Sequence, residues 1–172
     1  MLKWAVFILM FFVTTFKSSA DTIFIDGIEI NNDNKEVYCL AQNIYFESRN
    51  QPLVSKIGVG LVILNRVKSF SFHNTICKVV KQGKKWKQKI IKNQCQFSWY
   101  CDGKTDIPKD MVAWNQAWLL AVGMYGLKNH SLFDITNNAT YYHADYVRPK
   151  WATKFKRTIK LGNHLFYRME KK

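Results

Sequence analysis

The chain has 172 residues, of which 26 are Lys or Arg and 12 are Asp or Glu, so its formal net charge is +14. This length suits one domain with a substantial buried core and argues against several domains. The positive charge favours a polyanionic partner, such as cell wall, anionic lipid or nucleic acid.

Residues 1–20, MLKWAVFILMFFVTTFKSSA, combine a basic start at Lys3 with an apolar run and small residues near Ala20. This pattern predicts a secretory signal peptide cleaved after Ala20, followed by one domain over residues 21–172. A retained membrane anchor is the alternative, although the run is shorter than the roughly 20 residues of a spanning helix. We therefore expect export to the periplasm, cell wall or medium. A membrane contact is expected only through the leader, and a monomer is the default expectation.

Two helices are predicted in the first half of the domain. After a polar lead-in over 21–32, Asp33 and Glu36 have capping-box spacing, and the apolar residues that follow recur at a helical period. We expect a helix over about Lys35–Arg49. The next segment, residues 55–67, is apolar on almost every side, as in a buried central helix, and its Gly58 and Gly60 permit close backbone approach.

The middle of the chain mixes short elements with charge. Asn74 is expected to cap a short helix through Val80, and a lysine-rich loop over 78–94 with no acidic residue comes after it. This loop is either an ordinary solvated segment or an anion-binding surface. Asp106 and Pro108 resemble the start of a further helix, which runs toward Gly126.

The last forty or so residues change character. The segments NATYYHADYV and RTIKLGNHLFYRM are rich in aromatic and β-branched residues, with polar turns between them. They predict a short β-hairpin or small sheet packed on the helices. The expected fold is therefore α+β and mainly helical.

Four cysteines follow the leader: Cys39, Cys77, Cys95 and Cys101. In an exported chain an even number favours two disulfides, and four cysteines allow three pairings that the sequence does not distinguish. A zinc site is the competing interpretation, but no C-x-x-C pair or Cys/His cluster supports it. No metal or other cofactor is expected.

Glu47 is the most informative side chain. It lies three residues beyond Ile44 on the first predicted helix, at the edge of the buried face. A carboxylate there must be paired or have a raised pKa. Two interpretations stay open: a salt bridge to Arg49, Arg66 or a lysine, and a general acid kept protonated by an apolar wall, as in glycosidases.

Acidic residues are scarce after Glu47. Hydrolysis of a glycosidic bond usually uses two carboxylates, and the plausible second members are Asp102, Asp134 and Asp145. A single acid is sufficient if the substrate supplies the nucleophile. The C6 hydroxyl of muramic acid can do so by closing an internal anhydro ring, while one residue acts first as acid and then as base.

Six blocks in order carry a family resemblance: CLAQNIYFESR, VGLVILNRV, TICKVV, CQFSWYCDG, ATYYHADYVRPKW and KLGNHLFYR. Together, from about residue 36 to residue 168, they resemble the SleB-type cell wall hydrolases, the family of spore-cortex lytic enzymes. The resemblance implies a lysozyme-like domain that cleaves peptidoglycan glycan strands, as a lytic transglycosylase or a muramidase-type glycosidase. Glu47 matches the family's catalytic glutamate. Ser48, where the family usually has alanine, and the lysine-rich loop depart from its pattern.

Four further side chains are candidate substrate-binding residues. Gln96 and Ser98 lie in a turn that cysteines could staple, where polar groups can bind sugar hydroxyls. Tyr142 and His143 lie on a predicted strand, where either could orient the acid or a sugar group. The expected partners are peptidoglycan and the anionic wall surface. Nucleic acid is not expected, since only Trp86 interrupts the lysines and a stacking platform needs more aromatic residues.

Three alternatives remain for the function. A cysteine peptidase or amidase would use Cys101 or Cys39 with His143, and needs a free thiolate. A zinc amidase would use His143, Asp145 and His164. A non-enzymatic basic protein would bind a wall or membrane through residues 78–94.

Overall fold

The computed structural model describes residues 23–25, 28–30, 34–128 and 134–170, so the predicted signal peptide lies outside the described residues. The helices are α1 (Lys35–Ser48), α2 (Leu53–Lys68), α3 (Ile76–Val80) and α4 (Met111–Gly126), with 3-10 turns η1 (Ser98–Cys101) and η2 (Lys150–Lys154). The strands are β1 (Ile23–Ile25), β2 (Ile28–Ile30), β3 (Gly83–Trp86), β4 (Lys89–Cys95), β5 (Tyr141–Ala144), β6 (Lys156–Leu161) and β7 (His164–Arg168). Among these, no helix combines the length and apolar character needed to cross a bilayer.

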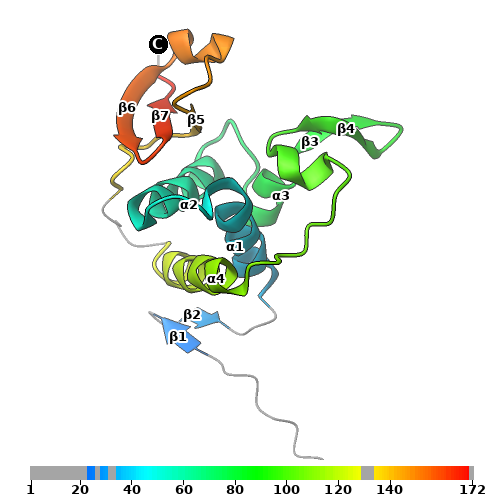
Figure 1. The fold of residues 1–172 in the computed structure, drawn as a ribbon, viewed down its shortest axis with the longest axis vertical. Helices are drawn as coiled ribbons and strands as arrows, with labels where there is room; N and C mark the ends of the chain where they lie inside the picture. Colours follow the sequence, from blue (N-terminus) through cyan, green and yellow to red (C-terminus); the bar gives the residue numbers. More distant parts are fainter. Residues whose placement is uncertain (1–22, 26–27, 31–33, 129–133, 171–172) are drawn as a thin grey trace, which may run out of the picture.

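Helix α1 is the centre of the helical layer and contacts α2, α3 and α4 (Figure 1). Its apolar stripe, which includes Val37, Leu40 and Ile44, is fully buried. Burying each such side chain contributes about 1.5–3 kcal/mol, so the predicted periodicity accounts for the position of α1. The predicted helices over 35–49 and 55–67 are confirmed within two residues at each end.

The helix caps differ from the predicted ones. Asn34 caps α1, because its side chain accepts from the N–H groups of Glu36 and Val37, so the predicted capping box at Asp33 is wrong. The Glu36 carboxylate instead accepts from the N–H of Ile76, at the start of α3. Both groups satisfy N–H donors that a helix leaves free at its first turn.

The starts of α3 and α4 are also shifted from the expected residues. Thr75, not Asn74, caps α3, with its hydroxyl accepting from Lys78 N–H. Asp110 caps α4, so that helix begins after the predicted Asp106 and Pro108, while its end at Gly126 is as expected. Each change selects a neighbouring residue that is also a good cap.

Helix α2 joins the helical layer to the C-terminal sheet. A Cβ atom at Gly58 would lie 2.7 Å from Phe166 Cζ, and one at Gly60 would lie 2.7 Å from Met124 Sδ. Only glycine lets α2 approach both neighbours this closely. The close approach inferred for these glycines is therefore confirmed.

The C-terminal sheet is antiparallel, with the strand order β5-β7-β6, which confirms the predicted small sheet. Tyr142 pairs with Phe166 and His143 pairs with Leu165. Because alternate residues of a strand point to opposite faces, Tyr142 and Phe166 share the face toward α2, and His143 and Leu165 share the other. The alternation therefore places two predicted site residues, Tyr142 and His143, on opposite faces of the sheet.

The prediction that the lysine-rich segment is a loop is wrong. Residues 83–95 form an antiparallel hairpin of β3 and β4, which extends away from the helices (Figure 1). Its turn residues, Lys87 and Gln88, both have positive φ angles, as a two-residue hairpin turn requires. A second hairpin, β1 with β2, occupies part of the lead-in, where the sequence indicated no element.

Two disulfides are present, as predicted. Cys39–Cys77 joins α1 to α3, and Cys95–Cys101 joins the end of β4 to η1. The fold is α+β and mainly helical, with a small C-terminal sheet, as the sequence indicated.

Candidate active site

Glu47 lies in the last turn of α1, where the helix meets strand β5 of the C-terminal sheet. Its side chain is half-buried, and the Tyr142 hydroxyl donates a hydrogen bond to Glu47 Oε2 at 3.0 Å. The two residues are 95 positions apart in the chain. The helical layer and the sheet therefore meet at the carboxylate that the sequence analysis singled out.

The environment of Glu47 favours a proton on its carboxyl group. Burial raises the pKa of Glu47 above its ordinary value, while the hydrogen bond from Tyr142 and the positive charge of Arg66 act in the opposite direction. Burial also raises the pKa of Tyr142 well above its ordinary value, so its hydroxyl stays a donor. A raised pKa increases the fraction of the carboxyl group that carries a proton at a given pH, which favours a role as a general acid.

Arg66, on α2, is a neighbour of this pair that the sequence analysis named as a possible salt-bridge partner of Glu47. It is 2% exposed, and its Nε donates to the Thr140 carbonyl at 2.7 Å. Its guanidinium carbon lies 5.0 Å from the centroid of Phe72 and 5.3 Å from that of Phe97. One terminal nitrogen has no partner among the described residues. Arg66 is therefore a fixed positive charge behind Glu47.

Asn43 is a second buried polar residue that the sequence analysis missed. It lies one helical turn before Glu47 and is fully buried. Its side chain is near enough to the Tyr142 hydroxyl to lower the pKa of Tyr142, yet its amide completes no hydrogen bond with a described residue. The spacing of four residues from Glu47 was the available signal, because such residues share a helix face.

The salt-bridge interpretation of Glu47 has little support. Among the described residues Glu47 takes part in no ion pair. Arg49, its nearest basic neighbour in the chain, instead donates to the Tyr45 hydroxyl and lies over the Tyr45 ring. The carboxyl group is thus held by one neutral hydroxyl donor.

The three other candidate carboxylates are engaged elsewhere. Asp134 accepts from Thr136 and Asn65, and these bonds hold its pKa below the ordinary value although burial raises it. Asp145 forms a 2.8 Å ion pair with Lys160, and Asp102 accepts from the Lys104 N–H in an exposed turn. None of the three contacts Glu47 through a described hydrogen bond or ion pair, so Glu47 is the one candidate acid of this site.

The turn with Gln96 and Ser98 lies beside the end of α1. The Trp99 ring stacks on Phe46, the residue before Glu47, with 4.7 Å between ring centroids. Gln96 and Ser98 flank this buried region with exposed side chains. The Gln96 N–H donates to the Gln82 carbonyl, so its backbone is fixed while its amide is free to face solvent.

His143 points away from Glu47, to the other face of the sheet. Its two ring nitrogens lie 2.8 Å from the Ala144 carbonyl and 3.0 Å from the Tyr167 hydroxyl. His164 does not join His143, because its Nδ1 forms a 2.8 Å hydrogen bond with the Ser55 hydroxyl. Across the described residues, no three His, Cys, Asp or Glu side chains gather as metal ligands would. The geometry therefore does not favour the zinc-amidase alternative.

The cysteine-nucleophile alternative is contradicted. Cys39 and Cys101 are each in a disulfide, and no cysteine of the described residues is free. A disulfide sulfur carries no thiolate, so neither residue can attack a carbonyl group.

The described residues contain no free cysteine and no cluster of metal ligands, so the site is built around one half-buried glutamate that accepts a hydrogen bond from a tyrosine of the small sheet. A family model described as cell wall hydrolase matches residues 50–167. The chain therefore belongs to the cell wall hydrolase family. The matched segment starts three residues after Glu47, so the role of Glu47 depends on its own geometry.

Curated and solved relatives agree with this family. The spore cortex-lytic enzyme of Bacillus cereus is 30% identical over 132 residues, which cover 76% of this chain and 43% of the relative. The chain thus spans less than half of that relative's length. The catalytic domain of the germination-specific lytic transglycosylase SleB from Bacillus anthracis superposes with a TM-score of 0.57 at 28% identity. That match covers 81% of this chain and all of the solved domain.

The catalytic domain of the Bacillus cereus SleB protein is also similar, with a TM-score of 0.53 at 28% identity. It covers 77% of this chain and 89% of the solved domain. These matches confirm the lysozyme-like fold expected from the resemblance, and they confirm the family itself.

Proposed function

We propose that the protein is an exported enzyme that cleaves the glycan strand of peptidoglycan, with Glu47 as its single acid/base. The observation that carries the proposal is the hydrogen bond from Tyr142 to a half-buried carboxyl group whose pKa is raised by burial. A solved relative named as a lytic transglycosylase catalytic domain supports the same reaction class.

The proposed reaction uses the carboxyl group of Glu47 twice, first to donate a proton and then to accept another. In the first half, the protonated carboxyl donates to the oxygen of the glycosidic bond, that bond breaks, and Glu47 becomes a carboxylate. In the second half, the carboxylate takes the proton of the muramic acid C6 hydroxyl, whose oxygen bonds to C1 of the same sugar. No water is consumed, and Glu47 ends protonated.

We favour this internal transfer over hydrolysis because Asp102, Asp134 and Asp145 are engaged away from Glu47. An inverting hydrolase needs a second carboxylate to activate water, and a retaining one needs a carboxylate nucleophile. Tyr142 and Arg66 favour the ionised form of Glu47 that the first half-reaction creates. They act where charge develops, which is where electrostatic stabilisation accelerates a reaction.

The test is the substitution Glu47→Gln, assayed on a suspension of purified peptidoglycan. We expect a folded protein that no longer clears the suspension, because glutamine has nearly the same shape and no proton to donate. Glu170→Gln is the matched control, since Glu170 is an exposed carboxylate whose ion-pair partner within the described residues is Lys156. Retained clearing by Glu47→Gln would refute the assignment. Mass spectrometry of the products separates the two reactions, since an anhydro end is one water lighter than a reducing end.

We also propose that Gln96 and Ser98 bind sugar hydroxyls beside Glu47, and that residues 1–20 direct export.

Lysines of the β3–β4 hairpin would attract the anionic wall, since Lys84, Lys85 and Lys89 are exposed there. Replacing these three by glutamine should weaken wall binding and flatten its salt dependence, while soluble glycan fragments are still cleaved. A sedimentation assay at two salt concentrations measures this, and unchanged binding would count against the surface.

A further inference from the structure

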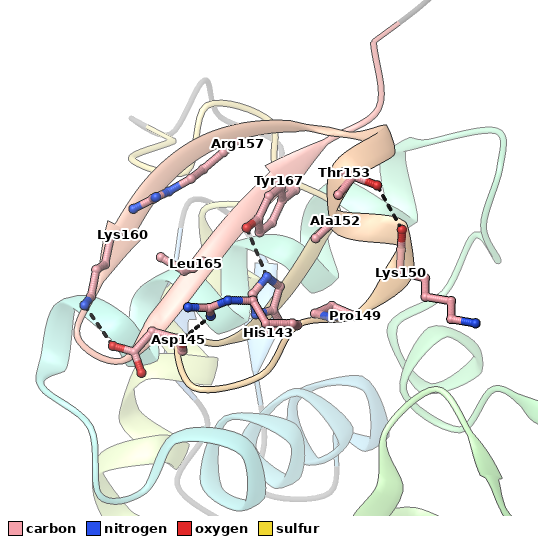
Figure 2. A pocket seen from close by; sticks show the side chains of 11 residues that line it. His143, Asp145, Pro149, Lys150, Ala152, Thr153, Arg157, Lys160, Leu165 and Tyr167 are labelled. Carbon is pink, nitrogen blue, oxygen red and sulfur yellow. Dashed lines mark hydrogen bonds and ion pairs between the residues drawn. The ribbon is translucent and has the colours of Figure 1, made fainter.

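A pocket of about 860 Å³ lies on the face of the sheet opposite Glu47 (Figure 2). Its position follows from strand parity: Tyr142 faces the acid, whereas His143, the next residue of β5, faces the pocket. Leu165 and Tyr167 of β7 are on the same side as His143. The pocket has no part in the site described above.

The pocket floor is preformed. His143, Leu165 and Tyr167 are each at least nine-tenths buried, and the rings of His143 and Tyr167 stack with 5.1 Å between centroids. The Ala144 carbonyl can only accept, so His143 Nδ1 carries a proton, and with a neutral ring the Tyr167 hydroxyl donates to Nε2. A floor already fixed by these bonds loses little freedom when a ligand binds.

The rim of the pocket is strongly basic. It carries one carboxylate, that of Asp145, and four cationic side chains, those of Arg148, Lys150, Arg157 and Lys160. Lys160 pairs with Asp145 at 2.8 Å (Figure 2). Arg148 donates to the Asp145 backbone carbonyl at 2.6 Å. The side chains of Arg157 and Lys150 have no hydrogen-bond or ion-pair partner among the described residues. These two cations are available to an anionic ligand.

We propose that this pocket binds the peptide stem of peptidoglycan, through its carboxylates. This inference rests on the proposed function, because it adds a second contact to the same substrate. A pocket of this size holds a small organic molecule rather than a single ion. Arg157 presents a planar fork that matches a carboxylate. The mixed rim favours a peptide, which carries amide donors and an amino group that Asp145 can attract, over a phosphodiester polymer, which carries negative charge alone.

The geometry of the sheet lets one substrate reach both faces. Strand β5 is an edge strand, so a stem attached to a sugar beside Glu47 passes around a single strand to reach the pocket. Four extended residues span about 13 Å. That reach exceeds the roughly 10 Å that separates two sheets stacked face to face, and a stem has to pass only one sheet.

The test is binding of the free tetrapeptide stem to the full protein, measured by calorimetry at physiological salt. The double variant Lys150→Gln/Arg157→Gln should weaken binding about tenfold, by loss of two charge-assisted contacts. The control Lys35→Gln/Lys109→Gln removes the same charge from two exposed residues far from the pocket in the chain, and should bind as the unchanged protein does. No binding of the tetrapeptide, or equal loss in both variants, would overturn the proposal.

Two further arms separate the possible failures. A soluble glycerol-phosphate polymer that binds in the pocket while the tetrapeptide does not would assign the site to a phosphodiester instead, against the proposal. Because calorimetry requires no turnover, Glu47→Gln should bind the tetrapeptide as tightly as the unchanged protein. Loss of clearing by Glu47→Gln tests the proposed reaction, and tetrapeptide binding tests the pocket, so either can fail alone.

Discussion

Substitution of Tyr142 by phenylalanine isolates the one hydrogen bond that Glu47 makes to a described residue. A hydrogen bond to a charged group contributes about 1.5–3 kcal/mol. Glu47 is neutral before proton transfer and becomes charged during it, so much of this energy is gained in the transition state. If half to all of the charge has developed there, kcat should fall between about fourfold and about 150-fold.

The pH dependence of kcat in Tyr142→Phe provides an independent test, because the direction of its change can be predicted. The Tyr142 hydroxyl stabilises the ionised carboxylate and thus lowers the pKa of Glu47. Its removal should raise that pKa, so the form able to donate a proton persists to higher pH. The alkaline limb of the kcat profile, which reports loss of the acid's proton, should move to higher pH in Tyr142→Phe.

The assay is the initial rate of release of soluble glycan fragments, measured from pH 4 to pH 9. Tyr141→Phe is the matched control, because it removes a hydroxyl from the adjacent tyrosine whose contact among the described residues is with the Met169 sulfur at 4.0 Å, not with Glu47. An unchanged kcat together with an unmoved alkaline limb in Tyr142→Phe would refute the reasoning. A lower kcat without a shift of the limb would mean that Tyr142 orients Glu47 and does not stabilise its charge.

Two further predictions concern stability, measured by urea unfolding. Gly58→Ala should lower the free energy of unfolding by about 1–3 kcal/mol, because the added methyl group would meet Phe166 at 2.7 Å; no loss would show that the sheet can move away from α2. Removing Cys39–Cys77, which spans 38 residues, should cost about 4 kcal/mol on the loop-entropy model, against about 2 kcal/mol for Cys95–Cys101, which spans 6. The reverse order would mean that local contacts, not chain closure, govern these bonds.

The helices were predictable because their apolar residues recur at a regular spacing. This spacing can be recognised without knowing which elements the helices pack against. The caps were not, because several good capping residues lie in series and tertiary contacts choose among them. The Tyr45 hydroxyl, for example, accepts from the N–H groups of Lys109 and Asp110. This fixes the backbone just before α4, so Asp110 becomes the cap.

The β3–β4 hairpin could not be predicted, since its turn uses Lys87 and Gln88 where Asn-Gly is the usual signal. The disulfide Cys95–Cys101 ties the end of β4 to η1, so a covalent bond also fixes the end of the hairpin. Composition correctly indicated that this segment is basic and exposed.

The candidate site was predictable in its acid and not in its partners. Glu47 stood out because a carboxylate at the edge of an apolar stripe must be paired or have a raised pKa. Tyr142 and His143 could not be ranked, because sequence gives alternation along a strand but not which set faces the helices. Arg66 was one of several possible salt-bridge partners in the sequence, and the fold shows that its charge acts on Glu47 without an ion pair among the described residues.

Strand β5 also has a consequence for how the chain tolerates change. A substitution at Tyr142 or His143 alters one face and leaves the other intact. Deletion of a single residue between Ala139 and Tyr142 would shift the register of β5 by one, placing the imidazole of His143 opposite Phe166, on the face of the acid, and the phenol of Tyr142 on the face of the basic pocket. A change of length in this short stretch therefore disturbs both faces of the sheet at once, whereas a substitution disturbs one.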